Sequence, residues 1–312
     1  MRFIDAATVH RVLDYAALVD RLEAMFRQGC EAPLRHHHAI KTEDGPEATL
    51  LLMPAWQVGR HIGVKIVTVF PGNAAKALPG VMGQYLLSDA RTGAPVALID
   101  GPSITVRRTA CASALASRYL SRPDARRLVM IGTGALAPHM IGAHAAVRPI
   151  CEVAIWGRDP AKAQALARSL AGGALAVRAV DDLAAAVAEA DIVSAATLAT
   201  EPVLRGAWLK PGTHVDLVGA YTPERRESDD EAVRRARVFV DTRAGATKEG
   251  GDVVQPLRSG VLKPDGIVAD LFELSRGEKK GRGGSDEITL FKSVGTALED
   301  LAAAELAVER SS

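Results

Sequence analysis

A short glycine-containing segment, IGTGALAP at residues 131–138, limits the fold of this chain more than any other feature. An apolar run, LVMI at 128–131, leads into it, and HMIGAHAAV at 139–147 follows with the composition of a helix. A buried strand that passes through a glycine-rich turn into a helix is the opening of a strand–helix–strand unit. The sequence therefore predicts a parallel sheet in this part of the chain.

The same alternation continues along the rest of the chain. Ala-rich helical segments such as PAKAQALARSLA and DDLAAAVAEA separate six β-like runs. These runs are RLVMIG, EVAIWG, LAVRAV, DIVSAAT, THVDLVG and ARVFVDT, and EITLFKSVG follows later, before a closing helix. Regular alternation of strand and helix predicts an α/β fold, a Rossmann-type doubly wound parallel sheet with helices on both faces.

The first third of the chain has a different pattern of predicted helices and strands. Residues 1–29 carry apolar residues at roughly helical spacing and predict helix. Four β-rich runs follow, separated by turn signals such as PGN and RTG: ATLLLMPAW, HIGVKIVTVF, GQYLLSDA and APVALID. The segment SITVRRTACASALASRYL predicts a helix with Ser103 or Thr105 as its N-cap. We therefore expect a second, β-rich α+β domain here.

Composition argues against several classes of function. The 312 residues have a formal net charge of +1 and no long run of Lys or Arg, so we expect no nucleic-acid partner. No apolar run reaches the roughly 18 residues of a membrane span, and the N-terminal segment is too charged for a signal peptide. Cys30, Cys111 and Cys151 are isolated, as expected of reduced thiols. These features predict a soluble cytoplasmic protein with no membrane partner.

The glycine segment fits the pattern G-x-G-x-x-A, with Gly132, Gly134 and Ala137 at its fixed positions. The first glycine permits the tight turn, and the second lets the backbone approach a pyrophosphate at the N-terminus of the helix. Pro138 suits the first helical turn, because its missing N–H would have no partner there. A tight turn without a ligand is the alternative, but the strand–turn–helix context favours a dinucleotide site.

The end of the next strand, VAIWGRD, bears on which dinucleotide is bound. Sites for NAD usually carry Asp or Glu at this point, where the carboxylate binds the ribose 2′-hydroxyl. Gly157 and Arg158 stand there in this chain, and a guanidinium can pair with a 2′-phosphate. We therefore expect NADP(H) to be preferred, with NAD(H) as the alternative if Asp159 binds the ribose.

Several basic residues point to an anionic substrate such as a carboxylate. Lys65 lies in a run that predicts a buried strand, where a lysine must reach solvent, form an ion pair or face a polar cavity. Arg107 and Arg108 precede TACASALA, whose helix N-terminus would itself attract an anion, and Arg35 lies just before the β-rich region. Taken singly, each of these residues also fits an ordinary surface charge.

Three consecutive histidines, His36, His37 and His38, do not predict a metal site. Adjacent residues on a strand point to alternate faces, so at most two of the three share a site. No Cys, Asp or Glu accompanies them at ligand spacing. We expect a partly exposed polar run and no bound metal.

Six stretches together resemble the ornithine cyclodeaminase/mu-crystallin family across nearly the whole chain. They are GVKIVTVFPGN, DARTGAPVALIDG, ITVRRTA, IGTGALA, LKPGTHVDLVGAYTPERRE and EITLFKSVGTALEDLAAA. The resemblance implies a homodimer with a β-rich substrate-binding and dimerisation domain at 1–120 and a Rossmann NAD(P)-binding domain at 121–295. It also implies that a C-terminal helix at 296–312 returns to the first domain.

The resemblance assigns roles to residues by position. Lys65 matches the family's active-site lysine, and Arg35 and Arg108 match the arginines that hold the substrate carboxylate, so Lys65 and Arg108 are the catalytic candidates. Gly80 and Tyr221 fall in segments that contact the substrate. The expected cofactor-binding residues are Thr109, Gly132, Thr133, Gly134, Ala135, Leu136, Ala137, Gly157, Arg158, Thr197, Gly219, Ser293, Val294 and Gly295.

Two departures from the family pattern bear on the reaction. Cyclodeaminases carry an acidic residue in a G-x-D-x-P stretch that reads Gly219-Ala-Tyr221-Thr-Pro223 here, and Gly80 replaces a small hydroxyl residue. The resemblance then favours an NAD(P)H-dependent reductase of cyclic ketimine carboxylates, of the Δ1-pyrroline-2-carboxylate or Δ1-piperideine-2-carboxylate type. The alternatives are an amino-acid dehydrogenase, an ornithine cyclodeaminase, and a non-catalytic protein that binds NADP(H) or a small ligand, like mu-crystallin.

Overall fold

The β-rich part of the chain and the alternating part form two units. The computed structural model describes residues 1–43 and 45–311. One unit comprises Met1–Arg108 together with Thr296–Ser312, and the other comprises Thr109–Gly295. The C-terminal segment therefore belongs to the same unit as the N-terminal part of the chain.

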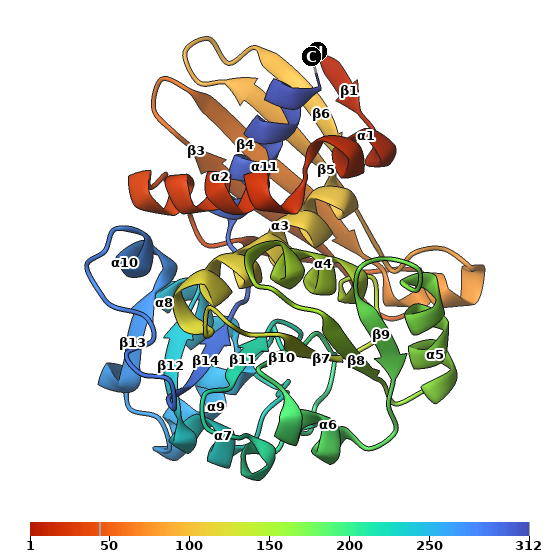
Figure 1. Cartoon of the computed structure of the whole chain (residues 1–312). Coiled ribbons are helices and arrows are strands. Elements are labelled where there is room, and N and C mark those ends of the chain that lie inside the picture. Colours follow the sequence, from red (N-terminus) through yellow and green to blue (C-terminus); the bar gives the residue numbers. More distant parts are fainter. Residues whose placement is uncertain (44, 312) are drawn as a thin grey trace. The chain divides into compact units, whose positions relative to one another are not determined.

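A six-stranded sheet is the framework of the first unit (Figure 1). Its strands are β1 (Arg2–Ile4), β2 (His36–Ile40), β3 (Ala48–Trp56), β4 (His61–Val69), β5 (Val81–Asp89) and β6 (Pro95–Asp100). Their order in space is β1-β6-β5-β4-β3-β2, with β1 parallel to β6 and the other neighbours antiparallel. The four predicted β-rich runs correspond to β3, β4, β5 and β6, which confirms them as strands.

Helices α1 (Ala6–Val12), α2 (Tyr15–Gln28) and α11 (Ala297–Arg310) and the 3₁₀ helix Pro71–Lys76 accompany this sheet. The prediction of helix over residues 1–29 is wrong at two points. Arg2–Ile4 pairs with β6, and Asp14 begins a new helix by accepting a hydrogen bond from the backbone N–H of Ala17. Helix α11 packs against α2 and against β3, β4 and β5, so one face of the sheet is covered by the C-terminal helix.

Helix α3 (Gly101–Leu120) begins before the predicted start. The prediction that Ser103 or Thr105 caps it is wrong, because the Asp100 carboxylate accepts the hydrogen bond from the backbone N–H of Ser103. Arg107 and Arg108 consequently lie inside the helix and not ahead of its N-terminus. Their interaction with an anion cannot then be helped by a helix N-terminus at TACASALA.

An eight-stranded sheet in which all neighbours are parallel forms the second unit (Figure 1). Its strands are β7 (Arg127–Ile131), β8 (Glu152–Trp156), β9 (Ala176–Ala179), β10 (Ile192–Ala195), β11 (His214–Leu217), β12 (Ala236–Val240), β13 (Ile267–Asp270) and β14 (Ile288–Lys292). The predicted doubly wound α/β fold is confirmed. Strand β13, with the sequence IVAD, was not among the predicted strands.

The helices of this unit lie on both faces of the sheet, with α4 on one and α6 and α7 on the other (Figure 1). They are α4 (Ala137–Val147), α5 (Pro160–Ser169), α6 (Leu183–Glu189), α7 (Asp230–Arg235), α8 (Arg243–Glu249), α9 (Gly251–Ser259) and α10 (Leu271–Ser275), with 3₁₀ turns at Gly206–Trp208 and Pro264–Gly266. Because both faces are covered, the strands are mainly apolar, and Val129, Ile131, Val193 and Val215 belong to one buried cluster.

The strand order places a topological switch point beside β7. The order is β13-β12-β14-β11-β10-β7-β8-β9, so the chain runs outward from β7 to β9 and then crosses to β10 on the other side of β7. Ligands of open α/β sheets bind at the carboxyl ends of the strands where the order reverses in this way. The glycine loop that follows β7 lies at this point. In the described part of the chain, no helix has the length and apolar character needed to cross a membrane.

Candidate functional site

Lys65 is buried within β4 and forms an ion pair. Its side chain lies on the sheet face that α11 covers, beside its strand neighbours Met53 and Tyr85. The residue is only 2% exposed, and its Nζ lies 2.8 Å from Oδ1 and 2.7 Å from Oδ2 of Asp300 in α11. Of the three sequence-based alternatives for this lysine, ion pairing is the one that the structure shows.

Burial lowers the pKa of Lys65 to about 8. Loss of hydration is the main cause, since it disfavours the ammonium form. The Asp300 carboxylate opposes this shift, while the positive charges of Arg108 and Arg35 add to it. An amine with this pKa exchanges a proton near neutral pH, which an exposed lysine does not do.

Arg108 reaches the same carboxylate from α3. Its Nε lies 3.0 Å from Oδ1 of Asp300, and its Nη1 lies 2.7 Å from Oε2 of Glu299. Burial acts to lower the pKa of Arg108, but Asp300 and Glu299 outweigh it and raise that pKa. Two cations and two carboxylates thus form an electrically balanced cluster.

The sequence analysis missed Asp300 and Glu299. Both carboxylates are buried, although they lie in the Ala-rich segment ALEDLAAAELAVER, where an acidic pair suggests an exposed helix face. Burial also acts to raise the pKa of Asp300, but Lys65 and Arg108 hold it below its ordinary value. An acidic pair within a helix that is otherwise rich in Ala and Leu is the signal that would have found them.

Tyr85 places a buried hydroxyl in the same region. Its Oη has no hydrogen-bond partner among the described residues. The ring lies across β4, because a Cβ at Gly63 would be only 1.9 Å from Oη. Burial raises the pKa of Tyr85, and the carboxylates of Asp300 and Glu305 add to this effect. A buried hydroxyl without a partner is the kind of group that a polar substrate atom satisfies.

The other predicted substrate residues are more scattered. Arg35 is half-buried just before β2 and lies near enough to Lys65 to affect its pKa. Gly80 is exposed before β5, and its carbonyl oxygen accepts a hydrogen bond from the N–H of Phe70. Tyr221 belongs to the second unit, is 45% exposed, and lies under the guanidinium of Arg225 at 6.0 Å. The structure therefore brings Lys65 and Arg108 together on the carboxylate of Asp300 and places Arg35 within electrostatic reach of Lys65. Among the described residues it shows no contact of Gly80 with them.

The glycine loop between β7 and α4 has the geometry of an anion cradle. Gly132 has a φ of +121°, and a Cβ there would lie 2.7 Å from the carbonyl oxygen of Ala196 after β10. A Cβ at Gly134 would meet nothing within 4 Å. The first glycine is therefore required by the turn, and the second leaves open space beside the backbone.

The N-terminus of α4 differs from those of the next three helices. Leu136 at its N-cap makes no side-chain cap, whereas Asp159, Asp182 and Asp229 cap α5, α6 and α7. In this turn the N–H of Ala137 already donates to the carbonyl oxygen of Gly134, and Pro138 has no N–H. A pyrophosphate would therefore be attracted by the positive end of the helix rather than by unpaired first-turn donors. Pro138 lies in the first turn, as predicted. These residues fit a dinucleotide, although sequence reasoning had no means to see the missing cap.

The end of β8 presents Gly157, Arg158 and Asp159 in the predicted order. Arg158 is exposed, and Asp159 accepts hydrogen bonds from the N–H groups of Ala161 and Lys162 through Oδ1. Gly157 packs on the loop, since a Cβ there would lie 2.7 Å from Cγ2 of Thr133. Asp159 therefore caps α5 through one of its two carboxylate oxygens.

Buried carboxylates hold the other predicted cofactor segments. Asp241, at the end of β12, accepts hydrogen bonds from Ser293 Oγ and from the N–H groups of Val294 and Gly295, at 3.1, 2.7 and 2.7 Å. Thr197 and Gly219, which follow β10 and β11, both donate to Glu227. Thr109 is buried in α3, next to Arg108. The sequence analysis missed Asp241 and Glu227, which act through backbone groups and so follow no side-chain motif.

Comparison with known proteins identifies the family of this chain. A model of the ornithine cyclodeaminase/mu-crystallin family matches residues 2–312. The Δ1-pyrroline-2-carboxylate reductase of Paracoccus denitrificans is 43% identical over 257 residues, which are 82% of this chain and 81% of that protein.

Solved structures give the same result. The Δ1-pyrroline-2-carboxylate reductase of Thermococcus litoralis, in complex with NADH and L-proline, matches with a TM-score of 0.93 and 34% identity over 100% of this chain and 97% of that one. An archaeal alanine dehydrogenase dimer with bound NAD matches with a TM-score of 0.90 and 27% identity over 100% and 96% of the two chains. The match to the family model extends over nearly the whole sequence, as the six resembling stretches predicted, and the chain belongs to the ornithine cyclodeaminase/mu-crystallin family.

Proposed function

We propose that this protein is an NAD(P)H-dependent reductase of cyclic ketimine carboxylates, with Δ1-pyrroline-2-carboxylate or its six-membered homologue as substrate. The observation that carries the proposal is the buried Lys65–Asp300–Arg108 cluster, in which the lysine has a pKa of about 8. The glycine loop at the switch point of the parallel sheet supports the cofactor requirement independently. The relatives named as Δ1-pyrroline-2-carboxylate reductases support the substrate class.

Reduction of a cyclic imine needs few groups from the protein. A hydride adds to the C=N carbon and a proton adds to the ring nitrogen, which leaves a cyclic secondary amine. The reduced nicotinamide supplies the hydride. The Lys65 ammonium is a suitable proton donor for the ring nitrogen, because its lowered pKa makes proton release easy near neutral pH. Asp300 holds the Lys65 amine in place during this exchange.

The substrate carboxylate requires a cation, and Arg108 is the proposed partner, with Arg35 beside it. The guanidinium of Arg108 is fixed by Glu299 and Asp300, so its orientation does not depend on the substrate. A guanidinium held in this way loses little conformational freedom when it binds a carboxylate. Tyr85, with its unpartnered hydroxyl, is a further candidate to contact the substrate.

Within the proposed cofactor site we assign NADP(H) as the preferred dinucleotide. Arg158 is exposed at the end of β8, where a 2′-phosphate would lie, and Asp159 is engaged as the cap of α5. NAD(H) is the alternative, and relatives solved with NADH and with NAD keep it open.

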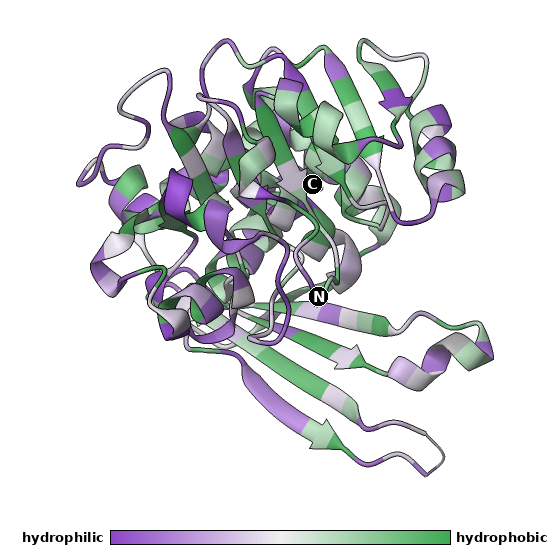
Figure 2. Cartoon of the chain, turned by 90° about the horizontal axis from the view of Figure 1, so that it is seen from below, coloured by the Kyte–Doolittle hydropathy of each residue, from purple (hydrophilic) through white to green (hydrophobic). Residues whose placement is uncertain are grey.

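We also propose that the protein is a homodimer that associates through the sheet of its first unit. The face opposite Lys65 carries a row of apolar neighbours on adjacent strands, namely Pro54, Val64, Leu86, Leu98 and Phe3. Phe3 is 70% exposed and Ile66, on the same face, is 40% exposed. Figure 2 shows the hydrophobic stretches of these strands in green. An apolar sheet face of this kind is typical of an interface between subunits, and the related alanine dehydrogenase is a dimer.

The proposed reaction is tested by incubating the purified protein with NADPH or NADH and Δ1-pyrroline-2-carboxylate, and by following the absorbance of the reduced cofactor. We expect cofactor oxidation and formation of proline. Parallel samples contain ornithine with the oxidised cofactor, in which released ammonia is measured, and an α-keto acid with ammonia. Ammonia from ornithine without imine reduction would indicate a cyclodeaminase, and reaction of the keto acid alone would indicate an amino-acid dehydrogenase. Cofactor binding without any turnover would indicate a binding protein.

A further inference from the structure

Three charged side chains are buried together in the second unit and have no part in the proposed reaction. They are Glu227, which precedes α7, Asp252 in α9 and Lys292 at the end of β14, and each is at most 1% exposed. Lys292 Nζ lies 3.1 Å from Oδ2 of Asp252 and 3.9 Å from Oε2 of Glu227. Two carboxylates thus share one ammonium, which is a costly arrangement unless further hydrogen bonds compensate for it.

The hydrogen bonds of Glu227 join two of the predicted cofactor segments. Its Oε1 accepts from the backbone N–H and from Oγ1 of Thr197, at 2.6 and 2.9 Å. Its Oε2 accepts from the N–H groups of Gly219 and Ala220, at 2.7 and 3.3 Å. One carboxylate therefore connects the segment after β10 with the segment after β11, at the carboxyl ends of neighbouring strands.

The two segments also touch each other directly. A Cβ at Gly219 would lie 1.9 Å from the carbonyl oxygen of Thr197 and 2.6 Å from Oε1 of Glu227. No residue other than glycine fits at this position without moving one of the two. The segments after β10 and β11 are consequently held as one assembly around the Glu227 carboxylate.

Asp252 and Lys292 support Glu227 in turn. Oδ1 of Asp252 accepts hydrogen bonds from the backbone N–H groups of Glu227 and Ser228, each at 2.9 Å. Lys292 offsets the negative charge and directly precedes Ser293, Val294 and Gly295 in the chain. The arrangement links the ends of β10, β11 and β14 through one buried network.

We propose that Glu227 is a positioning residue of the cofactor site, whose ionised carboxylate fixes Thr197 and Gly219 and so sets the affinity for the dinucleotide. The inference rests on the proposed function, because it concerns the cofactor of that reaction. Glu227 itself acts only through the backbone and hydroxyl groups that it binds.

Protonation of Glu227 should weaken cofactor binding. Each oxygen of Glu227 already accepts two hydrogen bonds. A proton added to either oxygen would therefore face the hydrogen of a donor and break that hydrogen bond. Burial raises the pKa of Glu227 to about 7; Lys292 and the donors from Thr197 oppose this shift, and Asp252 adds to it. The charged groups that face it are Lys292 of β14 and Asp252 of α9. Cofactor affinity should therefore decrease as the pH falls through about 7.

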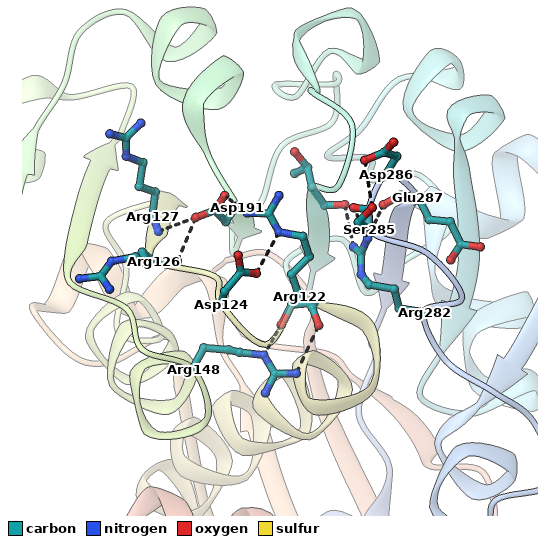
Figure 3. Close-up of polar contacts among 12 residues, drawn as sticks. Arg122, Asp124, Arg126, Arg127, Arg148, Asp191, Arg282, Ser285, Asp286 and Glu287 are labelled. Carbon is teal, nitrogen blue, oxygen red and sulfur yellow. Dashed lines mark hydrogen bonds and ion pairs between the residues drawn. The ribbon is translucent and has the colours of Figure 1, made fainter.

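A carboxylate at the amino ends of the strands of the same sheet, opposite the cofactor loops, provides a matched control. Oδ2 of Asp191 accepts hydrogen bonds from the N–H groups of Arg126 and Arg127, at 2.9 and 3.0 Å, at the amino end of β7 (Figure 3). Its Oδ1 pairs with Arg122 at 3.0 Å. Asp191→Asn thus disturbs hydrogen bonds of the same type, from backbone N–H groups to a buried carboxylate. These bonds lie away from the cofactor loops.

The experiment measures the dissociation constant of NADH by fluorescence titration without substrate, at several pH values on both sides of neutrality. NADH is chosen because it has no 2′-phosphate that titrates in this range. We compare the unmodified protein, Glu227→Gln and Asp191→Asn, and record the unfolding temperature of each. Glu227→Gln keeps the size of the side chain but turns an acceptor into a donor that faces either Thr197 or Gly219.

We expect Glu227→Gln to bind NADH about tenfold or more weakly and to lose the pH dependence, by the usual value of hydrogen bonds to a charged group. Asp191→Asn should lower the unfolding temperature but keep the affinity and the pH profile. Unchanged affinity in Glu227→Gln would overturn the proposal. If that variant does not fold, a pH-independent NADH affinity of the unmodified protein overturns it, and an affinity that weakens below neutral pH supports it. Failure of the proposed function is read separately, because the NADH titration needs no turnover: NADH binding without imine reduction would remove the proposed reaction and leave the test of Glu227 intact, whereas no NADH binding by the unmodified protein at any pH would remove the cofactor site itself.

Discussion

The Nζ of Lys65 lies 2.8 Å from Oδ1 of Asp300, although 235 positions separate the two residues in the chain. The pair joins a central strand of the first sheet to the C-terminal helix that covers it. Each residue changes the pKa of the other in the direction that keeps the pair ionised: Asp300 raises that of Lys65, and Lys65 lowers that of Asp300. Because each residue changes the pKa of the other, a substitution of one should change the pH dependence of the reaction.

Removing the charge of Asp300 should shift the pH profile of the reaction. The Lys65 ammonium is the proposed proton donor, so kcat/KM should fall as the pH rises through about 8. Asp300→Asn removes the charge that raises the pKa of Lys65, and this pKa should therefore fall further. The alkaline limb of the profile should then move to lower pH. Glu299→Gln is the control, because Glu299 contacts Arg108 and has no hydrogen bond to Lys65.

Removal of the lysine itself gives the size of its contribution. Lys65→Ala should lower kcat/KM by ~10²-fold or more if the amine takes part in proton transfer or alignment. Near-normal turnover in this variant would leave the reaction in place but exclude Lys65 from it.

Arg108→Ala should raise KM and also destabilise the fold. The guanidinium is the proposed partner of the substrate carboxylate, which it would bind in both the ground state and the transition state. Its loss leaves Glu299 and Asp300 buried with one fewer cation, which typically costs about 3–5 kcal/mol of the free energy of unfolding. Arg107→Ala is a matched control, since Arg107 is its neighbour in α3 but binds His10 and stacks on Tyr15. An unchanged KM in Arg108→Ala would contradict the assignment.

The sequence predicted the elements better than the contacts between them. The β-rich runs and the alternation after residue 126 gave strands and the parallel sheet correctly, because periodicity is a local property. The start of α3 was wrong because two candidate caps, Ser103 and Thr105, stand just after the acceptor that is used, Asp100. Asp300 and Glu227 were missed because their partners are distant in the chain or belong to the backbone. The sequence shows that both residues are charged, but it does not show that they are buried.

Cofactor preference should depend on Arg158. Because this residue is exposed, its pair with a 2′-phosphate is partly screened, and we expect NADPH to bind about three- to tenfold more tightly than NADH. Arg158→Ala should abolish the difference, while Arg168→Ala, at the far end of α5, should not. Gly157→Asp is a poor test, because a Cβ there would lie 2.7 Å from Thr133. Equal or tighter binding of NADH by the unmodified protein would refute the preference.

The acid stability of the second unit should depend on Asp216. Its Oδ2 lies 3.2 Å from Nε2 of His144, whose Nδ1 lies 2.9 Å from Oγ of Ser117, and all three are fully buried. These are the residue types of a hydrolase triad, but all three side chains are fully buried, so a substrate has no access to them. Burial acts to raise the pKa of Asp216, but the hydrogen bond and charge of His144, together with His214 and Ser113, outweigh it, so the pKa is lowered.

The lowered pKa fixes the direction of the effect. Stabilisation by Asp216 is fully present above the unfolded carboxyl pKa of about 4 and disappears as the pH falls through the folded pKa. Asp216→Asn should therefore cost about 1–3 kcal/mol at neutral pH and flatten the loss of stability in acid. Denaturant unfolding at several pH values checks this, with the exposed Asp124→Asn as control. An unchanged acid slope in Asp216→Asn would contradict it.

Association of two copies should depend on the apolar face of the first sheet. Ile66 is 40% exposed on the strand face opposite Lys65, so a charge there does not disturb the buried cluster. Ile66→Glu would place a carboxylate in the proposed interface, where it would lose its hydration without gaining a partner. We expect the unmodified protein to sediment at twice its chain mass of 32.9 kDa and Ile66→Glu at the chain mass. Val58→Glu, in the exposed turn before β4, should remain dimeric. A monomeric unmodified protein at micromolar concentration would refute the dimer and leave the apolar face without a partner.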